Sequence, residues 1–137
     1  MRITYNGINF KNKGIGVEFE MRKILSRGKS IDNNQWIYGY YDKSTDCIID
    51  KNNSAFIVDF GTIGHFTGIV DKNGNKIFEG DIVNIKGYTE PLIIYVNNDY
   101  SCYALGEGEE KIYIQGSNTK NVVVIGNIYD NPELMEK

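Results

Sequence analysis

The sequence predicts an all-β protein, and three features of its composition support this class. Among 137 residues, 20 Ile and 8 Val stand against 2 Ala and 4 Leu. Ten Tyr, six Phe and one Trp add further strand-forming side chains. β-Branched and aromatic residues fit a pleated, half-buried surface, whereas Ala and Leu favour helices. Fifteen Gly and only two Pro are typical of many turns and few rigid linkers.

Short apolar segments separated by turn residues mark the expected strands. A hairpin is expected at the start, where Asn6-Gly7 separates Arg2–Tyr5 from Ile8–Phe10. Clusters of Asp, Asn and Ser at residues 32–34 and 51–54 supply turn chemistry between later strands. The remaining strands are expected at Lys23–Arg27, Gln35–Asp42, Cys47–Asp50, Ala55–Phe60, Thr67–Asp71, Lys76–Phe78, Asp81–Lys86, Leu92–Asn97, Ser101–Leu105, Lys111–Gln115 and Val122–Tyr129.

The sharpest local signal is Asn73-Gly74, which lies between two of these apolar segments. Both residue types tolerate a positive φ, so the pair predicts a tight hairpin turn with positive φ at Gly74. The regular spacing of the strands indicates a small barrel or sandwich. A short helix is expected at the end of the chain, because Asn131 is a good N-cap and Pro132 a good first helical residue.

Residues 1–20 are interpreted as an extension that precedes the main domain. The segment is too apolar for a disordered tail, since it holds Ile3, Tyr5, Ile8, Phe10, Ile15, Val17 and Phe19. The last three alternate with Gly or Glu, which is the period of a half-buried strand. We expect residues 15–20 to add a strand to a sheet edge, in the same subunit or a neighbouring one.

Composition and charge exclude several classes of protein. The longest apolar run is Leu92–Val96, whereas a membrane-spanning helix needs about 20 residues. The first residues contain no apolar core of a secretory signal, so none is expected. The formal charge of −3 argues against a general polyanion-binding protein. The charge is uneven: residues 1–70 carry 9 basic and 7 acidic groups, and residues 71–137 carry 6 and 11.

No catalytic or metal-binding pattern is found. His65 is the only histidine, and neither Cys47 nor Cys102 has a local pattern that marks a nucleophile. We expect both cysteines to be small strand residues and His65 to cap a turn. Two Cys 55 positions apart and one His do not match a zinc site, and the loop from Asp71 lacks the Gly and Glu of a calcium loop. No metal, cofactor or catalytic residue is therefore predicted.

One group of residues has the character of a binding surface. Arg22, Lys23, Arg27 and Lys29 form a local basic cluster. Three aromatic residues follow on one face of the next strand, with Ile37 and Tyr41 on the other. Cations beside an aromatic face bind single-stranded nucleic acid by charge and stacking, although core aromatics beside a solvated strand edge give the same pattern. The candidate residues for binding a partner or nucleic acid are Arg22, Arg27, Lys29, Trp36, Tyr38 and Tyr40.

Three stretches resemble the YopX family of phage and prophage proteins. They are RKILSRGKSIDNNQWIYGYY from Arg22, HFTGIVDKNGNKIFEGDIV from His65, and VVVIGNIYDNPELME from Val122. The most specific elements are the pattern T-G-x-x-D-x-x-G-x-x-I-F/Y-E-G-D and the closing V-I-G-N-I-Y-x-N-P-E-L. The resemblance covers residues 21–136. Members usually carry an aromatic or aliphatic residue where Ser26 stands, so that strand is expected to pack differently here.

The resemblance implies an all-β domain over residues 21–137, with an SH3-like barrel at about 65–137 beside an N-terminal antiparallel subdomain. It also implies action in the cytoplasm of an infected bacterium, and no enzymatic activity or cofactor comes with it. The leading hypothesis is a non-enzymatic accessory protein that contacts a host or phage protein or forms a homo-oligomer, because exposed strand edges invite pairing between copies. The alternative is a nucleic-acid-binding SH3-like module. An enzyme built around His65 ranks third.

Overall fold

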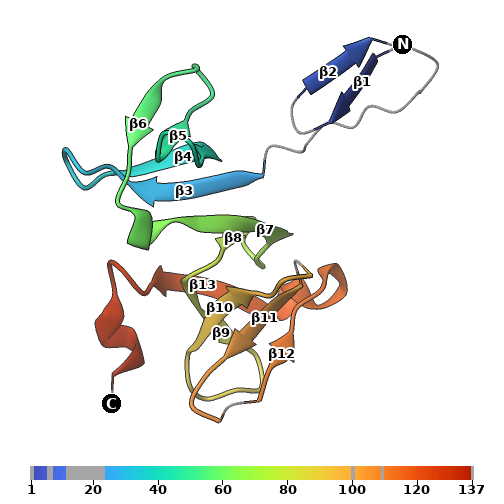
Figure 1. The fold of residues 1–137 in the computed structure, drawn as a ribbon. Coiled ribbons are helices and arrows are strands. Elements are labelled where there is room, and N and C mark those ends of the chain that lie inside the picture. Colours follow the sequence, from blue (N-terminus) through green and yellow to red (C-terminus); the bar gives the residue numbers. More distant parts are fainter. Residues whose placement is uncertain (1, 6–7, 12–23, 100, 109, 137) are drawn as a thin grey trace.

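The fold is seen in a computed structural model that describes residues 2–5, 8–11, 24–99, 101–108 and 110–136. It confirms the all-β class. The helical segments among these residues are three short 3-10 helices, η1 (Phe60–Thr62), η2 (Gly116–Asn121) and η3 (Pro132–Met135). The strands form one hairpin and two antiparallel sheets, which make up two lobes (Figure 1).

The predicted N-terminal hairpin is present. Strands β1 (Arg2–Tyr5) and β2 (Ile8–Lys11) pair antiparallel, with Tyr5 opposite Ile8. Residues 6–7 and the strand expected at residues 15–20 lie outside the described residues.

The six-stranded sheet contains the next six strands in the order β6-β5-β4-β3-β7-β8. Turns of the predicted kind connect several of them, and Asn34, Asp46 and Asn53 take the positive φ that Asn and Asp tolerate best. The strands are β3 (Leu25–Lys29), β4 (Trp36–Asp42), β5 (Cys47–Ile49), β6 (Ala55–Ile57), β7 (Gly64–Val70) and β8 (Lys76–Phe78).

This sheet curls until the end of β6 returns to β3. Ser30 forms a bridge with Val58, and the backbone N–H of Ile31 donates to the carbonyl of Ile57 at 3.1 Å. The curled face encloses a small core. A Cβ added at Gly28 would lie 3.1 Å from the side chains of both Ile48 and Val58. These two side chains can pack this close to β3 because Gly28 has no side chain.

The curl also requires Gly39 in the middle of β4. A Cβ at this position would lie 2.0 Å from the carbonyl oxygen of Ile49 and 3.0 Å from the Cα of Asp50. No side chain fits there without moving the backbone that leaves β5. Because Gly39 has no side chain, the turn after β5 can pack directly against β4.

The hairpin of β7 and β8 confirms the turn predicted at Asn73-Gly74, since Gly74 has a φ of +84°. The Asp71 carboxylate organises this turn by accepting from the backbone N–H of Asn73 and Asn75, and its second oxygen accepts from the N–H of Val124 at 2.9 Å. Burial raises the pKa of Asp71, but these hydrogen bonds together hold it below its ordinary value. The turn is therefore tied to the second sheet.

The second sheet has five strands in the order β12-β11-β10-β9-β13. The apolar core lies against it and includes Ile77 of β8, Val83, Ile85, Leu92, Ile94, Cys102, Ala104, Ile114 and Val122. The strands are β9 (Asp81–Ile85), β10 (Leu92–Val96), β11 (Cys102–Leu105), β12 (Ile112–Tyr113) and β13 (Val122–Asn127).

Two expectations for the C-terminal half are corrected. The five strands do not close into the predicted SH3-like barrel among the described residues: β9 pairs with both β10 and β13, and β12, with two residues, ends the sheet. The last helical segment, η3, is a four-residue 3-10 helix. The side chain of Asn131 does not cap it, because its Oδ1 accepts from the N–H of Asn127 at 3.2 Å.

Candidate functional site

A buried ion pair joins the two sheets. The Arg27 side chain on β3 donates from Nη2 to Oδ1 of Asp81 on β9 at 2.7 Å, and the two side chains are only 7% and 3% exposed. The other oxygen of Asp81 accepts from the backbone N–H of Phe78, also at 2.7 Å. Burial raises the pKa of Asp81, and the nearby Arg27 opposes that rise. Arg27 and Asp81 thus hold the start of the second sheet against the first.

Aromatic rings surround the Arg27 guanidinium. Its central carbon lies 4.7 Å from the centre of the Trp36 ring and 4.8 Å from that of the Phe78 ring. Cations positioned over such rings are attracted by the negative face of the π system. The sequence placed Arg27 and Trp36 in one candidate site, and the structure brings them together inside the protein.

Two more residues of the predicted site, Lys29 and Trp36, bind the carboxylate of Asp130. The Lys29 ammonium forms an ion pair with this carboxylate, and Trp36 Nε1 donates to the same group at 2.7 Å. The hydrogen bond from Lys29, followed by that from Trp36, lowers the pKa of Asp130 to about 2. The Tyr129 ring meets the Trp36 ring edge-on, with centroids 5.9 Å apart. Lys29 and Trp36 therefore fix the end of the chain to β3 and β4.

The other three predicted residues are distributed differently. Tyr38 packs the edge of its ring against Phe78 with centroids 5.5 Å apart, yet remains 48% exposed. Tyr40 is half-buried and lies opposite Leu25 in the sheet. Arg22 lies outside the described residues. Trp36, Tyr38 and Tyr40 share the predicted face of β4.

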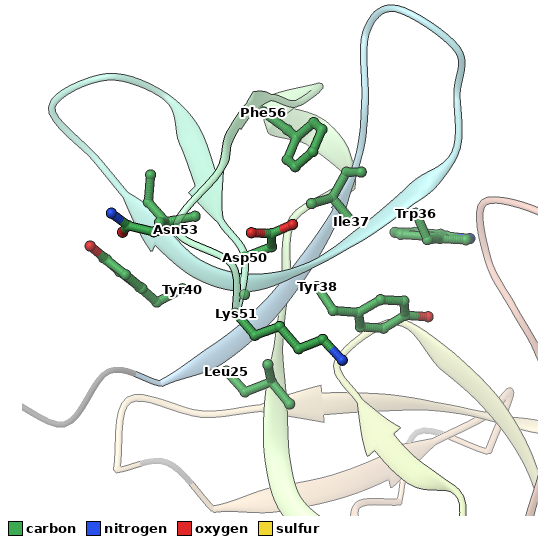
Figure 2. Close-up of a pocket in the computed structure, with 11 residues that line it drawn as sticks. Leu25, Trp36, Ile37, Tyr38, Tyr40, Asp50, Lys51, Asn53 and Phe56 are labelled. Atoms are coloured by element: carbon green, nitrogen blue, oxygen red, sulfur yellow. The ribbon is translucent and has the colours of Figure 1, made fainter.

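A shallow concavity surrounds this part of β4 and has a volume of about 740 Å³. Trp36 and Tyr38 project to one side of the strand and Ile37 projects toward Phe56 in Figure 2. The lining is mainly apolar, with a polar rim from the turn after β5. The lining residues are Leu25, Trp36, Ile37, Tyr38, Gly39, Tyr40, Ile49, Asp50, Lys51, Asn53 and Phe56.

Hydrogen bonds within the turn after β5 hold the polar rim of the concavity in place. Asp50 Oδ1 accepts from the backbone N–H groups of Asn52 and Ser54, both at 2.9 Å. Lys51 is exposed and adds a cation to the rim. An open apolar surface with a few fixed polar groups has the composition of a protein-contact site. No His or Cys stands among the residues that line it.

A Ser–His pair exists elsewhere, between Ser26 of β3 and His65 of β7. Ser26 Oγ lies 2.7 Å from His65 Nδ1, but Ser26 is only 1% exposed, so a substrate carbonyl has no access to its hydroxyl. His65 lies within β7 and does not cap a turn, which corrects that expectation. It occupies the space beside the small Ser26 side chain.

The two cysteines are strand residues, as predicted, and they are buried at the starts of β5 and β11. Burial raises the pKa of Cys102 to about 11. Its thiol is therefore protonated at neutral pH, and a protonated thiol is a poor nucleophile.

Asp81 and Asp130 are the site residues that sequence reasoning missed. The Asp81 carboxylate accepts from the backbone N–H of Phe78 at the entry to β9. Its ion pair with Arg27 was not foreseen. The place of Asp81 in the E-G-D motif was an available signal, whereas the closing motif leaves the position of Asp130 unspecified.

Within the described ranges, no three His, Cys, Asp or Glu side chains gather in a way that could hold a metal ion. No helix in that part of the chain is long and apolar enough to cross a membrane.

Fold and site together define an all-β protein. A buried ion pair joins its two larger sheets, and the six-stranded sheet carries an open apolar concavity. Comparison with known families gives a match to the YopX protein family over residues 11–136. The chain belongs to the YopX family. The match begins ten residues before Met21, within the segment interpreted as an extension. A comparison with curated proteins found no match.

Proposed function

We propose that this YopX-family protein is a non-enzymatic phage or prophage accessory protein of the bacterial cytoplasm. It acts through contact with a host or phage protein, or with copies of itself. The observation that carries this proposal is the concavity around β4, which presents apolar and aromatic side chains on the surface of a protein with an ample core elsewhere.

The shape of the concavity favours a macromolecular partner. Small-molecule sites are enclosed enough to bury most of their ligand, whereas this one is shallow and open. Tyr38 and Trp36 are residue types that dominate the binding energy of protein interfaces. Tyr38 is held by Phe78 and so meets a partner in one orientation, at a low cost in side-chain entropy.

The alternative, a nucleic-acid-binding SH3-like module, is less well supported. A protein binds nucleic acid when its Lys and Arg side chains neutralise phosphates and release the counterions of those phosphates. Arg27 is buried against Asp81, and Lys29 is paired with Asp130. A phosphate would have to displace these carboxylates, at the cost of the junction between the sheets.

Site-specific photo-crosslinking tests the proposal. A benzophenone amino acid replaces Tyr38 in the concavity or, as a control, Tyr88, which is 46% exposed in the loop after β9. Both proteins are irradiated in infected cells. We expect discrete protein adducts from position 38 and none of the same mass from position 88. Adducts with nucleic acid, or identical adducts from both positions, would refute the proposal.

A further inference from the structure

The edge of β4 that faces away from β3 is covered by β5 over only part of its length. β5 pairs with β4 as far as Tyr40, which lies opposite the last residue of β5, Ile49. The next residue, Asp50, turns away and donates its backbone N–H to the carbonyl of Ser54 at 2.9 Å. β4 itself begins at Trp36. The first half of β4 therefore has an edge to which no strand of the described residues is bonded.

Hydrogen bonds around Lys29 show that the backbone groups of Trp36 point to this open edge. The two residues lie opposite each other in the sheet. Lys29 donates its backbone N–H to Thr62 Oγ1, and its carbonyl accepts from the N–H of Asp59, both at 2.8 Å. Both backbone groups of Lys29 therefore point away from β4, which makes Lys29 and Trp36 a non-hydrogen-bonded pair. In such a pair, the N–H and C=O of each residue point away from the other strand, so those of Trp36 point to the open edge.

Tyr38 has the same backbone orientation as Trp36, because the direction of the N–H and C=O groups repeats at every second residue of a strand. Its opposite residue, Arg27, is paired on its other side with Gly64 of β7. In the described part of the chain, no hydrogen bond engages the backbone N–H or C=O of Trp36 or Tyr38. Two donors and two acceptors are therefore available along this edge to an added strand.

The concavity around β4 lies along the open edge, since its lining includes both the first half of β4 and the residues at which β5 leaves it. Ile37 projects toward Phe56, while Trp36 and Tyr38 project to the other side of the strand (Figure 2). Side chains alternate along an added strand as well. One side chain of such a strand would lie beside Ile37 and Phe56. Its two neighbours would lie beside the rings of Trp36 and Tyr38.

The rim of the concavity adds a positive charge. Lys51 is exposed, and no carboxylate of the described residues forms an ion pair with its ammonium. The neighbouring Asp50 carboxylate accepts from two backbone N–H groups of its own turn. An acidic side chain in an occupant would therefore pair with Lys51, and a basic one would be repelled.

We propose that the open edge of β4 binds an extended segment of a partner protein as an added strand, with an apolar residue beside Ile37 and an acidic residue beside Lys51. This rests on the proposed function, because it specifies how a partner occupies the concavity. Backbone hydrogen bonds to Trp36 and Tyr38 provide affinity, and the side chains that alternate along the segment provide specificity. An unpaired strand edge is a ready template for such pairing.

Peptide binding to the full-length protein tests the inference. The probe is a short peptide selected from a displayed random library for binding to the wild type. We expect an extended peptide with an apolar centre and an acidic residue. Tyr38→Asp is expected to weaken its binding roughly tenfold or more, and Lys51→Glu to weaken it by repulsion. Tyr88→Asp, at an exposed tyrosine outside the concavity, should leave binding unchanged. Circular dichroism verifies that each variant is folded.

Methylation of single amide nitrogens in the peptide tests whether it binds as a strand. An added strand directs every second N–H to β4, so methylation is expected to weaken binding at alternate positions and to have no effect between them. NMR hydrogen exchange gives the matching readout on the protein. The amide protons of Trp36 and Tyr38 should exchange more slowly in the complex, whereas that of Ile37, which faces β3, should not change.

Three results would overturn the inference. They are the failure to select any peptide, methylation effects without alternation, and binding that both Tyr38→Asp and Lys51→Glu leave unchanged. Slow exchange of Trp36 and Tyr38 that depends on protein concentration without peptide would also overturn it, by assigning the edge to a second copy of the chain. The crosslinks from position 38 in infected cells decide the proposed function separately.

Discussion

Arg27 and Asp81 lie 54 positions apart in the sequence and bind each other in the buried junction between the two sheets. Arg27 also lies between the Trp36 and Phe78 rings, so one side chain connects β3, β4, β8 and β9. Three of the residues that gave the sequence its nucleic-acid-binding character, Arg27, Lys29 and Trp36, therefore hold parts of the protein together. Trp36, Tyr38 and Tyr40 also line the apolar concavity beside them.

Breaking this ion pair is expected to destabilise the protein strongly. Arg27→Met leaves the Asp81 carboxylate buried without a counter-charge, which costs about 3–5 kcal/mol. Arg27→Met/Asp81→Asn removes both charges and is expected to recover much of the loss. Urea unfolding followed by circular dichroism measures the free energies. A loss below about 1 kcal/mol for the single variant would contradict the role of the pair.

Acid is expected to weaken the attachment of the C-terminal end. The pKa of Asp130 is lowered from 3.8 to about 2. A lowered carboxyl pKa stabilises the fold above pH 3.8, and this contribution disappears as the pH falls from 3.8 to about 2. Over that range, the Tm of the wild type should fall more steeply than that of Asp130→Asn. Because Asp130 is partly exposed, salt should reduce the difference. Parallel curves for the two proteins would refute the assignment.

The turn at Asn73-Gly74 gives a test of backbone strain alone. A Cβ at Gly74 meets no atom within 4 Å, so only its φ of +84° opposes a substitution. We expect Gly74→Val to cost about 1–2 kcal/mol, since a β-branched residue resists positive φ. Chemical denaturation measures the cost, and a variant as stable as the wild type would show that this turn carries no strain.

Gly39→Ala is expected to fail for a different reason, because its Cβ would lie 2.0 Å from the Ile49 carbonyl oxygen. The backbone after β5 must move, with an expected cost of roughly 3 kcal/mol. Gly116→Ala is the matched control, since its Cβ meets nothing within 4 Å. Equal stability of the two variants, measured by thermal melting, would contradict the close approach of β4 and β5.

The Ser26–His65 pair is expected to matter for stability and not for activity. His65→Ala removes the 2.7 Å partner of a buried hydroxyl and should cost about 1–3 kcal/mol. Cys47→Ala is expected to leave the biological effect unchanged as well. Phage propagation and thermal melting are the measurements. Loss of the biological effect with unchanged melting would restore the hypothesis of an enzyme built around His65.

Local features of the sequence predicted most of the strands. The excess of Ile and Val over Ala and Leu indicated the fold class, and turn residues such as Asn73-Gly74 marked the strand ends. Both signals are short-range: a strand and its turn depend on adjacent residues. The alternation of Trp36, Ile37 and Tyr38 likewise predicted the two faces of β4, which the pairing with β3 confirms.

Long-range relations were not predictable in the same way. Nothing near Lys29 indicates that Asp130, 101 positions later, neutralises it. The return of Val58 to Ser30 and the open edge at β12 depend on how whole strands are paired. A basic cluster has the same sequence whether its side chains bind phosphates or carboxylates of the same protein. Sequence reasoning therefore located the candidate site but did not identify the groups that its cations bind.

Affinity capture of the full-length protein from infected cells, with and without nuclease, tests most directly whether it acts through protein contact at β4. The wild type and Tyr88→Asp are predicted to retain the same partner protein after nuclease treatment, or additional copies of the chain. Tyr38→Asp, with its folding verified by circular dichroism, is predicted to lose that partner. Material that disappears on nuclease treatment, or capture unaffected by Tyr38→Asp, would contradict the account.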